Sequence, residues 1–154
     1  MRVAGLGVSR IGAFRPRRDP TVGAAIRVFG TPSTRDLTRS NGCRVQWRAL
    51  RLRVLFYNFG GAPAGQTTCA SGVGRAQSLT IRGRRFRTWK GLRVGMASDR
   101  IPELHPAAEF RQGSWWLRTA TSPFGDGSEY GVLRAIVGDG RVRAFAGWIG
   151  AAGE

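Results

Sequence analysis

Apolar and polar side chains alternate with a period of two over long parts of this chain, and this pattern constrains the fold most. From Cys43 to Trp47 the apolar residues alternate with Arg44 and Gln46. Because successive side chains of a β-strand point to opposite faces of a sheet, the pattern predicts strands with one apolar and one polar face. The segments that share the pattern are 44–48, 50–59, 75–82, 114–120, 131–137 and 141–149. They predict an antiparallel sheet of about six strands, the last two joined by a tight turn at Gly138-Asp139-Gly140.

Two other segments have the spacing of short helices. Asp19-Pro20 predicts a helix start, because Asp caps a helix N-terminus and Pro fits the first turn. Apolar residues then recur every three or four positions as far as Phe29, and Gly30 predicts the helix end. A second helix is expected over 98–104, where Pro102 keeps it short. We therefore predict an α+β fold with both helices on one face of the sheet.

The expected order of helix, strand, strand, strand occurs twice along the chain. This order suggests two related halves, 19–83 and 91–149, within a single domain that spans 19–149. Residues 1–18 are rich in Gly and Arg and are predicted to form an irregular arm, and 150–154 a tail. At 154 residues the chain is long enough to bury a substantial core.

A short motif in the second half resembles a known group of proteins. Gly91-Leu92-Arg93-Val94-Gly95-Met96, followed by a short helix ending near Pro106, resembles the helix start of small bacterial envelope modules. These are the SmpA/OmlA outer-membrane lipoproteins and the tandem-repeat β-lactamase inhibitory proteins. Ala97 stands where that motif has Ser or Thr. The resemblance implies an antiparallel sheet backed by helices, an open sheet face used for protein binding, and secretion.

The charge of the chain is strongly one-sided. Lys and Arg total 25 against nine Asp and Glu, which gives a formal net charge of +16, and every basic residue except Lys90 is Arg. Between Leu37 and Ser98 there are twelve basic residues and no acidic one. Such a segment would attract nucleic acid, anionic lipid or an acidic protein. The alternative is an Arg-rich surface that is only solvated, as expected from a compositional bias toward Arg.

The alternation also predicts where the arginines point. On each expected strand the residues opposite the apolar set include Arg, so one sheet face would carry arginines together with two aromatic side chains. Trp116 would be an exposed anchor on this face or a buried residue at its edge. We expect this face to bind an acidic protein or an anionic polymer, and the candidate residues are Arg51, Arg53, Tyr57, Arg82, Trp116, Arg118, Arg134 and Arg143.

Cys43 and Cys69 are the two cysteines of the chain. A disulfide between them would stabilise the fold by about 3.5 kcal/mol on a chain-entropy argument, and would require an oxidising compartment. The alternative is two buried free thiols. The first residues do not predict a signal peptide, because Arg10 interrupts a short apolar stretch. Either the protein is cytosolic, or the start of the reading frame is missing and the protein is extracytoplasmic.

The residues that usually carry catalysis are sparse. The nine carboxylates are scattered, and His105 is the one histidine, at the expected end of the second helix. We expect no enzyme activity, no metal and no cofactor. No stretch approaches the ~18 apolar residues of a transmembrane helix.

The leading prediction is a non-catalytic, extracytoplasmic binding module that uses the Arg and aromatic face. The alternative is a cytosolic nucleic-acid-binding protein, in which the basic and aromatic segment Arg84–Lys90 could contact phosphates and bases. Phe86 and Trp89 of that segment could equally pack onto the core.

Overall fold

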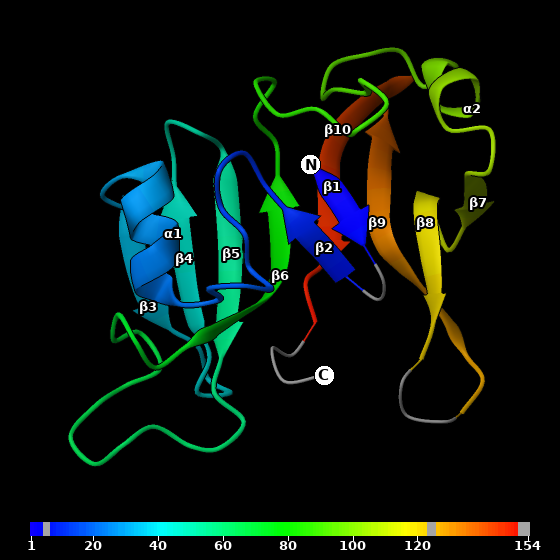
Figure 1. Cartoon of the computed structure of the whole chain (residues 1–154). Helices are drawn as coiled ribbons and strands as arrows, with labels where there is room; N and C mark the ends of the chain where they lie inside the picture. The colour runs from blue at the N-terminus through cyan, green and yellow to red at the C-terminus, as the bar shows by residue number, and fades with distance from the viewer. Residues whose placement is uncertain (5–6, 123–125, 151–154) are drawn as a thin grey trace.

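The structure is a computed structural model that describes residues 1–4, 7–122 and 126–150. Eight antiparallel strands form one sheet in the order β3-β4-β5-β6-β10-β9-β8-β7 (Figure 1). The strands are β3 (Thr34–Leu37), β4 (Cys43–Trp47), β5 (Leu52–Tyr57), β6 (Arg75–Ile81), β7 (Glu109–Arg111), β8 (Ser114–Thr121), β9 (Glu129–Gly138) and β10 (Arg141–Trp148). The prediction of an antiparallel sheet with two short helices is confirmed, but about six strands was too few.

The two strands that the alternation missed lie at the edges of the sheet. β3 and β7 are four and three residues long, and most of their side chains are exposed. An edge strand pairs on one side and buries little of either face, so it needs no regular alternation of apolar residues. Its sequence therefore resembles that of a loop.

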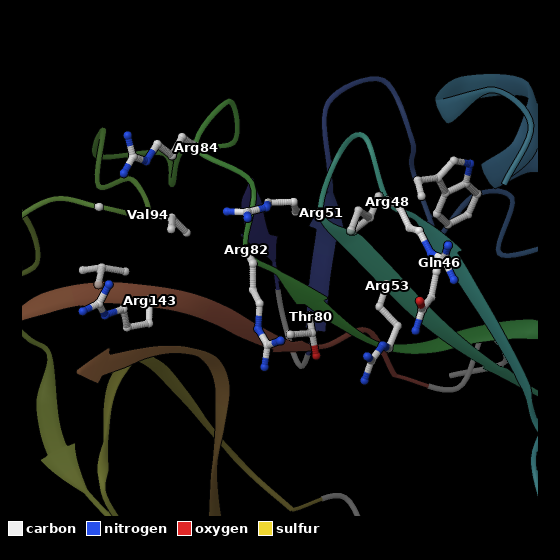
Figure 2. Close-up of a pocket in the computed structure, with 13 residues that line it drawn as sticks. Gln46, Arg48, Arg51, Arg53, Thr80, Arg82, Arg84, Val94 and Arg143 are labelled. Atoms are coloured by element: carbon white, nitrogen blue, oxygen red, sulfur yellow. The ribbon is translucent and has the colours of Figure 1, made fainter. Parts of the chain in front are cut away.

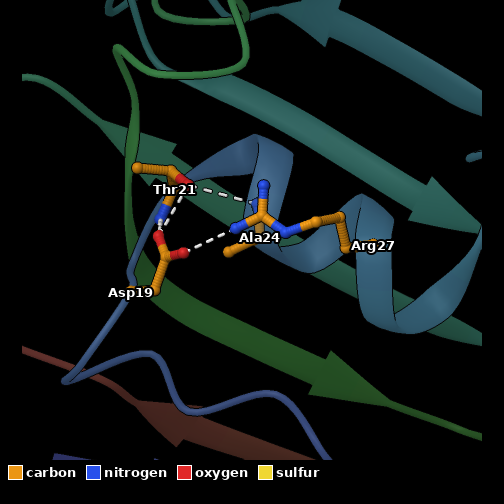
Figure 3. Close-up of polar contacts among 4 residues, drawn as sticks. All are labelled: Asp19, Thr21, Ala24 and Arg27. Atoms are coloured by element: carbon orange, nitrogen blue, oxygen red, sulfur yellow. Dashed lines mark hydrogen bonds and ion pairs between the residues drawn. The ribbon is translucent and has the colours of Figure 1, made fainter.

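The first helix, α1 (Val22–Phe29), begins two residues later than predicted. The hydroxyl of Thr21 accepts a hydrogen bond from the Ala24 amide at 3.1 Å, so Thr21 is the N-cap. Asp19 instead accepts from the Thr21 hydroxyl at 2.8 Å and pairs with Arg27 at 2.7 Å (Figure 3). Gly30 ends the helix at φ 82°, as predicted.

The second helix, α2 (Arg100–Leu104), is a single turn. Pro102 lies in its first turn, where a backbone N–H has no partner within the helix, so the proline fits without breaking a hydrogen bond. Ile101 is fully buried and belongs to the main core cluster. Both helices therefore pack against the same core.

Residues 1–18 do not form the predicted irregular arm. β1 (Arg2–Ala4) and β2 (Gly7–Arg10) pair as an antiparallel hairpin, which lies in front of the middle of the sheet in Figure 1, with β2 against β9 and β10. Val8, Ile11 and Phe14 are fully buried in the core. A Cβ at Gly147 would lie 2.9 Å from Val8 Cγ2, so this glycine allows β2 to approach β10. The arm prediction was wrong because three spaced apolar residues among glycines and arginines have no strand or helix period.

In each half of the sheet the strands follow one another in chain order from the outer edge to the centre. The chain runs α1-β3-β4-β5-β6 and then α2-β7-β8-β9-β10, and the two series meet where the last strand of each pairs, β6 with β10. The element order thus occurs twice, with four strands in each series instead of the three predicted. Thr80 pairs with Ala146 at the centre of the sheet.

Cys43 and Cys69 form a disulfide, with their Cα atoms 5.0 Å apart. It joins the first residue of β4 to the long connection between β5 and β6. The guanidinium of Arg35 donates two hydrogen bonds to the Cys69 carbonyl, at 2.8 and 2.5 Å. Of the two alternatives that the sequence left open, the structure contains the crosslinked one.

Candidate binding face

One face of the sheet is covered and the other is not. Within 1–4, 7–122 and 126–150, both helices and the β1–β2 hairpin pack on the face that bears the buried row Val45, Val54, Leu79, Gly147 and Leu133. We call the opposite face the open face. Consecutive Cα partners in one row across it are Thr34, Gln46, Arg53, Thr80, Ala146, Arg134, Trp116 and Glu109.

Three of the predicted arginines lie on the open face as expected from their strands. Arg53 and Arg134 belong to the central row, and Arg82 follows β6 two residues after Thr80. The side-chain oxygen of Gln46, with its amide oriented toward Arg53, accepts from Arg53 Nε at 3.0 Å and from Nη2 at 3.2 Å. Arg44 lies in the neighbouring row, opposite Leu55.

Arg118 was placed on the wrong face. A bulge at Leu117 shifts the register of β8, so that Arg118 lies opposite Leu133 and not opposite an open-face residue. Leu133 is fully buried in the core. One inserted residue reverses the facing of the residues after it, and strict alternation cannot predict this.

Trp116 lies on the open face but is not an exposed anchor. It is 5% exposed, and the Arg111 guanidinium lies 5.5 Å from its ring centre. A Cβ at Gly131 would lie 2.6 Å from Arg134 Cγ and 3.1 Å from Trp116 Cδ2, so this glycine leaves room for both side chains. The indole Nε1 is buried with no hydrogen-bond partner among the described residues. Of the two alternatives for Trp116, the buried one is observed.

Tyr57 takes part in a local cluster near the β3–β4 connection. Its hydroxyl lies 2.8 Å from Ser40 Oγ, and its ring stacks on Phe59 with the centroids 6.0 Å apart. It also lines a shallow depression with Arg53 and Leu55. The tyrosine is therefore half-buried at one side of the open face, with its hydroxyl bonded to Ser40.

A cavity of about 600 Å³ lies at one end of the open face, and we call it the arginine cavity. The turn between β4 and β5, the end of β6, the segment around Gly95 and the start of β10 meet there (Figure 2). It gathers Arg51, Arg53, Arg82 and Arg143 from the predicted set and adds Arg48 and Arg84. The alternation could not include Arg84 because that residue lies in a loop.

Acidic side chains lie at both edges of the open face and at the β9–β10 turn, and Asp36 of β3 lies opposite Arg44 at the β3 edge. Arg111 of β7 pairs with both Glu129 and Glu109, and the hydrogen bonds that its guanidinium donates to these carboxylates raise its pKa. Arg143 pairs with Asp139 at the β9–β10 turn. Other arginines have no ion pair or side-chain hydrogen bond in the described ranges, namely Arg44, Arg48, Arg51, Arg82 and Arg84.

The side chain of His105 is buried and hydrogen-bonded within the fold. It is 3% exposed, and its Nε2 lies 2.8 Å from the Thr88 hydroxyl, which accepts from the Leu92 amide. Burial, followed by the charge of Lys90, lowers the pKa of His105 to about 4, so the ring is neutral near pH 7. The hydrogen bond between Nε2 and the Thr88 hydroxyl anchors the end of α2 to the 88–92 loop.

The basic and aromatic segment is divided between core and surface. Phe86 is buried in the core cluster, and the exposed Trp89 contacts the His105 ring edge to face at 4.9 Å. The part of the chain that the structure describes holds no group of three or more His, Cys, Asp or Glu side chains that could bind a metal ion. It also contains no helix long and apolar enough to cross a membrane.

Comparisons with protein-family models, with curated proteins and with solved structures found no match to this chain.

Proposed function

We propose that this chain is a non-catalytic binding module whose open face docks on an acidic protein surface. The observation that carries the proposal is the set of unpaired arginines on a sheet face that no described helix or strand covers. Charges of one sign on a broad surface favour a partner of opposite sign and speed its association. Eight strands about 4.8 Å apart span roughly 34 Å, enough for a protein interface of standard size.

A protein partner fits this face better than a nucleic acid. The arginines lie among half-buried apolar and aromatic groups, including Leu55, Tyr57 and Trp148. Such a mixture is typical of protein interfaces, where aromatic anchors and Arg are enriched. Duplex readers place a helix or a narrow β-ribbon in a groove, whereas α1 packs on the covered face here.

The disulfide supports an extracytoplasmic location. Cytosolic proteins rarely keep structural disulfides, because the glutathione and thioredoxin systems reduce their thiols. We therefore expect Cys43 and Cys69 to be joined in protein purified from its own host without reductant. Alkylation followed by mass spectrometry measures this, and two alkylated cysteines would contradict an oxidising location.

Charge reversal on the open face tests the docking proposal. Arg44→Glu with Arg134→Glu removes positive charge from the face and lies outside the arginine cavity. The matched control is Arg18→Glu with Arg118→Glu, two exposed positions off the open face. We expect binding to immobilised poly-L-glutamate to weaken about tenfold more in the face variant than in the control.

Two results would contradict the docking proposal. Equal losses in both double variants would mean that net charge alone attracts the polymer. Tighter binding to a duplex DNA than to poly-L-glutamate, with a log–log salt slope of about −0.9 per phosphate contacted, would favour the nucleic-acid alternative.

A further inference from the structure

The arginine cavity concentrates charge beyond what a docking face requires. Six arginines line it, and its described lining contains no Asp or Glu. Figure 2 shows that these side chains come from several elements, namely the β4–β5 turn, β5, the β6 end, the following loop and β10. The arginines that line it are Arg48, Arg51, Arg53, Arg82, Arg84 and Arg143.

Most of these charges have no counter-charge within the described ranges. Arg143 pairs with Asp139, whose side chain is 86% exposed outside the cavity, and Arg53 is held by the neutral Gln46. The other four have neither an ion pair nor a side-chain hydrogen bond there. Like charges held close together repel, and a bound anion would relieve that repulsion.

One left-handed backbone position and two glycines lie next to the arginines of the cavity. Arg51 has φ 50°, a left-handed conformation that bulky residues rarely adopt, and its carbonyl accepts from the Arg82 amide at 2.8 Å. A Cβ at Gly95 would lie 3.3 Å from Arg84 Nε, and a Cβ at Gly138 would lie 3.2 Å from Arg143 Cγ. These contacts fix the turn to the end of β6 and leave space for two of the long side chains.

The chemistry of the lining selects the class of ligand. A guanidinium presents a planar fork of donors that matches the oxygens of a phosphate group in a bidentate way. The cavity volume lies within the range of small-molecule sites, and Thr80 adds a hydroxyl to its wall. We propose that the arginine cavity binds a compact ligand that carries several phosphate groups, of the condensed-phosphate class. This site goes beyond the docking proposal, because it requires no protein partner.

Isothermal titration with inorganic tripolyphosphate at constant ionic strength tests the site. We expect one ligand per chain and a loss of affinity of about tenfold or more for Arg82→Gln with Arg84→Gln. Arg51→Gly is a second variant that removes a charge while suiting the left-handed backbone, so it should fold normally and also bind more weakly. The matched control, Arg18→Gln with Arg118→Gln, should change the affinity by less than about twofold.

The possible results separate this site from the docking face. Equal losses in the cavity and control variants, or several ligands per chain, would overturn the proposal in favour of diffuse attraction by net charge. Citrate binding as tightly as tripolyphosphate would overturn the phosphate class. Arg44→Glu with Arg134→Glu should weaken poly-L-glutamate binding and leave tripolyphosphate affinity within about fivefold, so either proposal can fail alone.

Discussion

His105 shows how a single buried side chain can make stability depend on pH. Its neutral ring forms a hydrogen bond with the Thr88 hydroxyl and packs against Trp89. Protonation would place a charge in a buried position, beside the positive charge of Lys90. The folded state therefore disfavours the charged form, and the unfolded state does not.

We predict a loss of stability on mild acidification. The pKa of His105 is about 4 in the folded chain and near 6.5 in the unfolded chain, so the unfolded state binds more protons between these values. The free energy of unfolding should fall by roughly 2 kcal/mol between pH 7 and pH 5. Urea denaturation at both pH values measures this. In His105→Gln the fall should largely disappear, and an unchanged fall would show that other groups cause it.

Among the elements, the sequence predicted those strands and helices that bury one regular apolar face against the core. The strands from β4 to β6 and from β8 to β10 alternate because one face of each packs on the core, and α1 has an apolar stripe for the same reason. β3, β7 and the β1–β2 hairpin lie at edges or carry glycines, so they have too few spaced apolar residues for a periodic pattern.

The candidate face was predictable only where strands are regular. Arg53, Arg82 and Arg134 lie on the open face because no bulge interrupts the alternation between them and the neighbouring buried residues of their strands. Arg118 follows a bulge, and Arg51 lies in a turn with φ 50°. Trp116 has the predicted parity, but its burial depends on Arg111, Arg134 and the small size of Gly131, which are tertiary contacts.

At the scale of the whole molecule, two series of elements with the same order contribute different chemistry to one face. The first series supplies most of the unpaired arginines, through β4, β5 and β6 and the connections between them. The second supplies Trp116, Tyr130 and Trp148, which line a depression of about 400 Å³ with Arg134. The open face thus changes from basic to aromatic across the β6–β10 pairing, which suits an acidic partner with an apolar contact at one end.

NMR mapping of the contact surface tests whether the open face binds the acidic ligand. Uniformly labelled protein is titrated with poly-L-glutamate, and shifts of the backbone amides and of the Arg Nε–H groups are followed. We predict the largest shifts at Arg44, Arg53, Thr80 and Arg134, with little change in α1 or β2. Shifts centred on the covered face, or spread over all arginines including Arg118, would contradict the assignment of the open face as the binding surface.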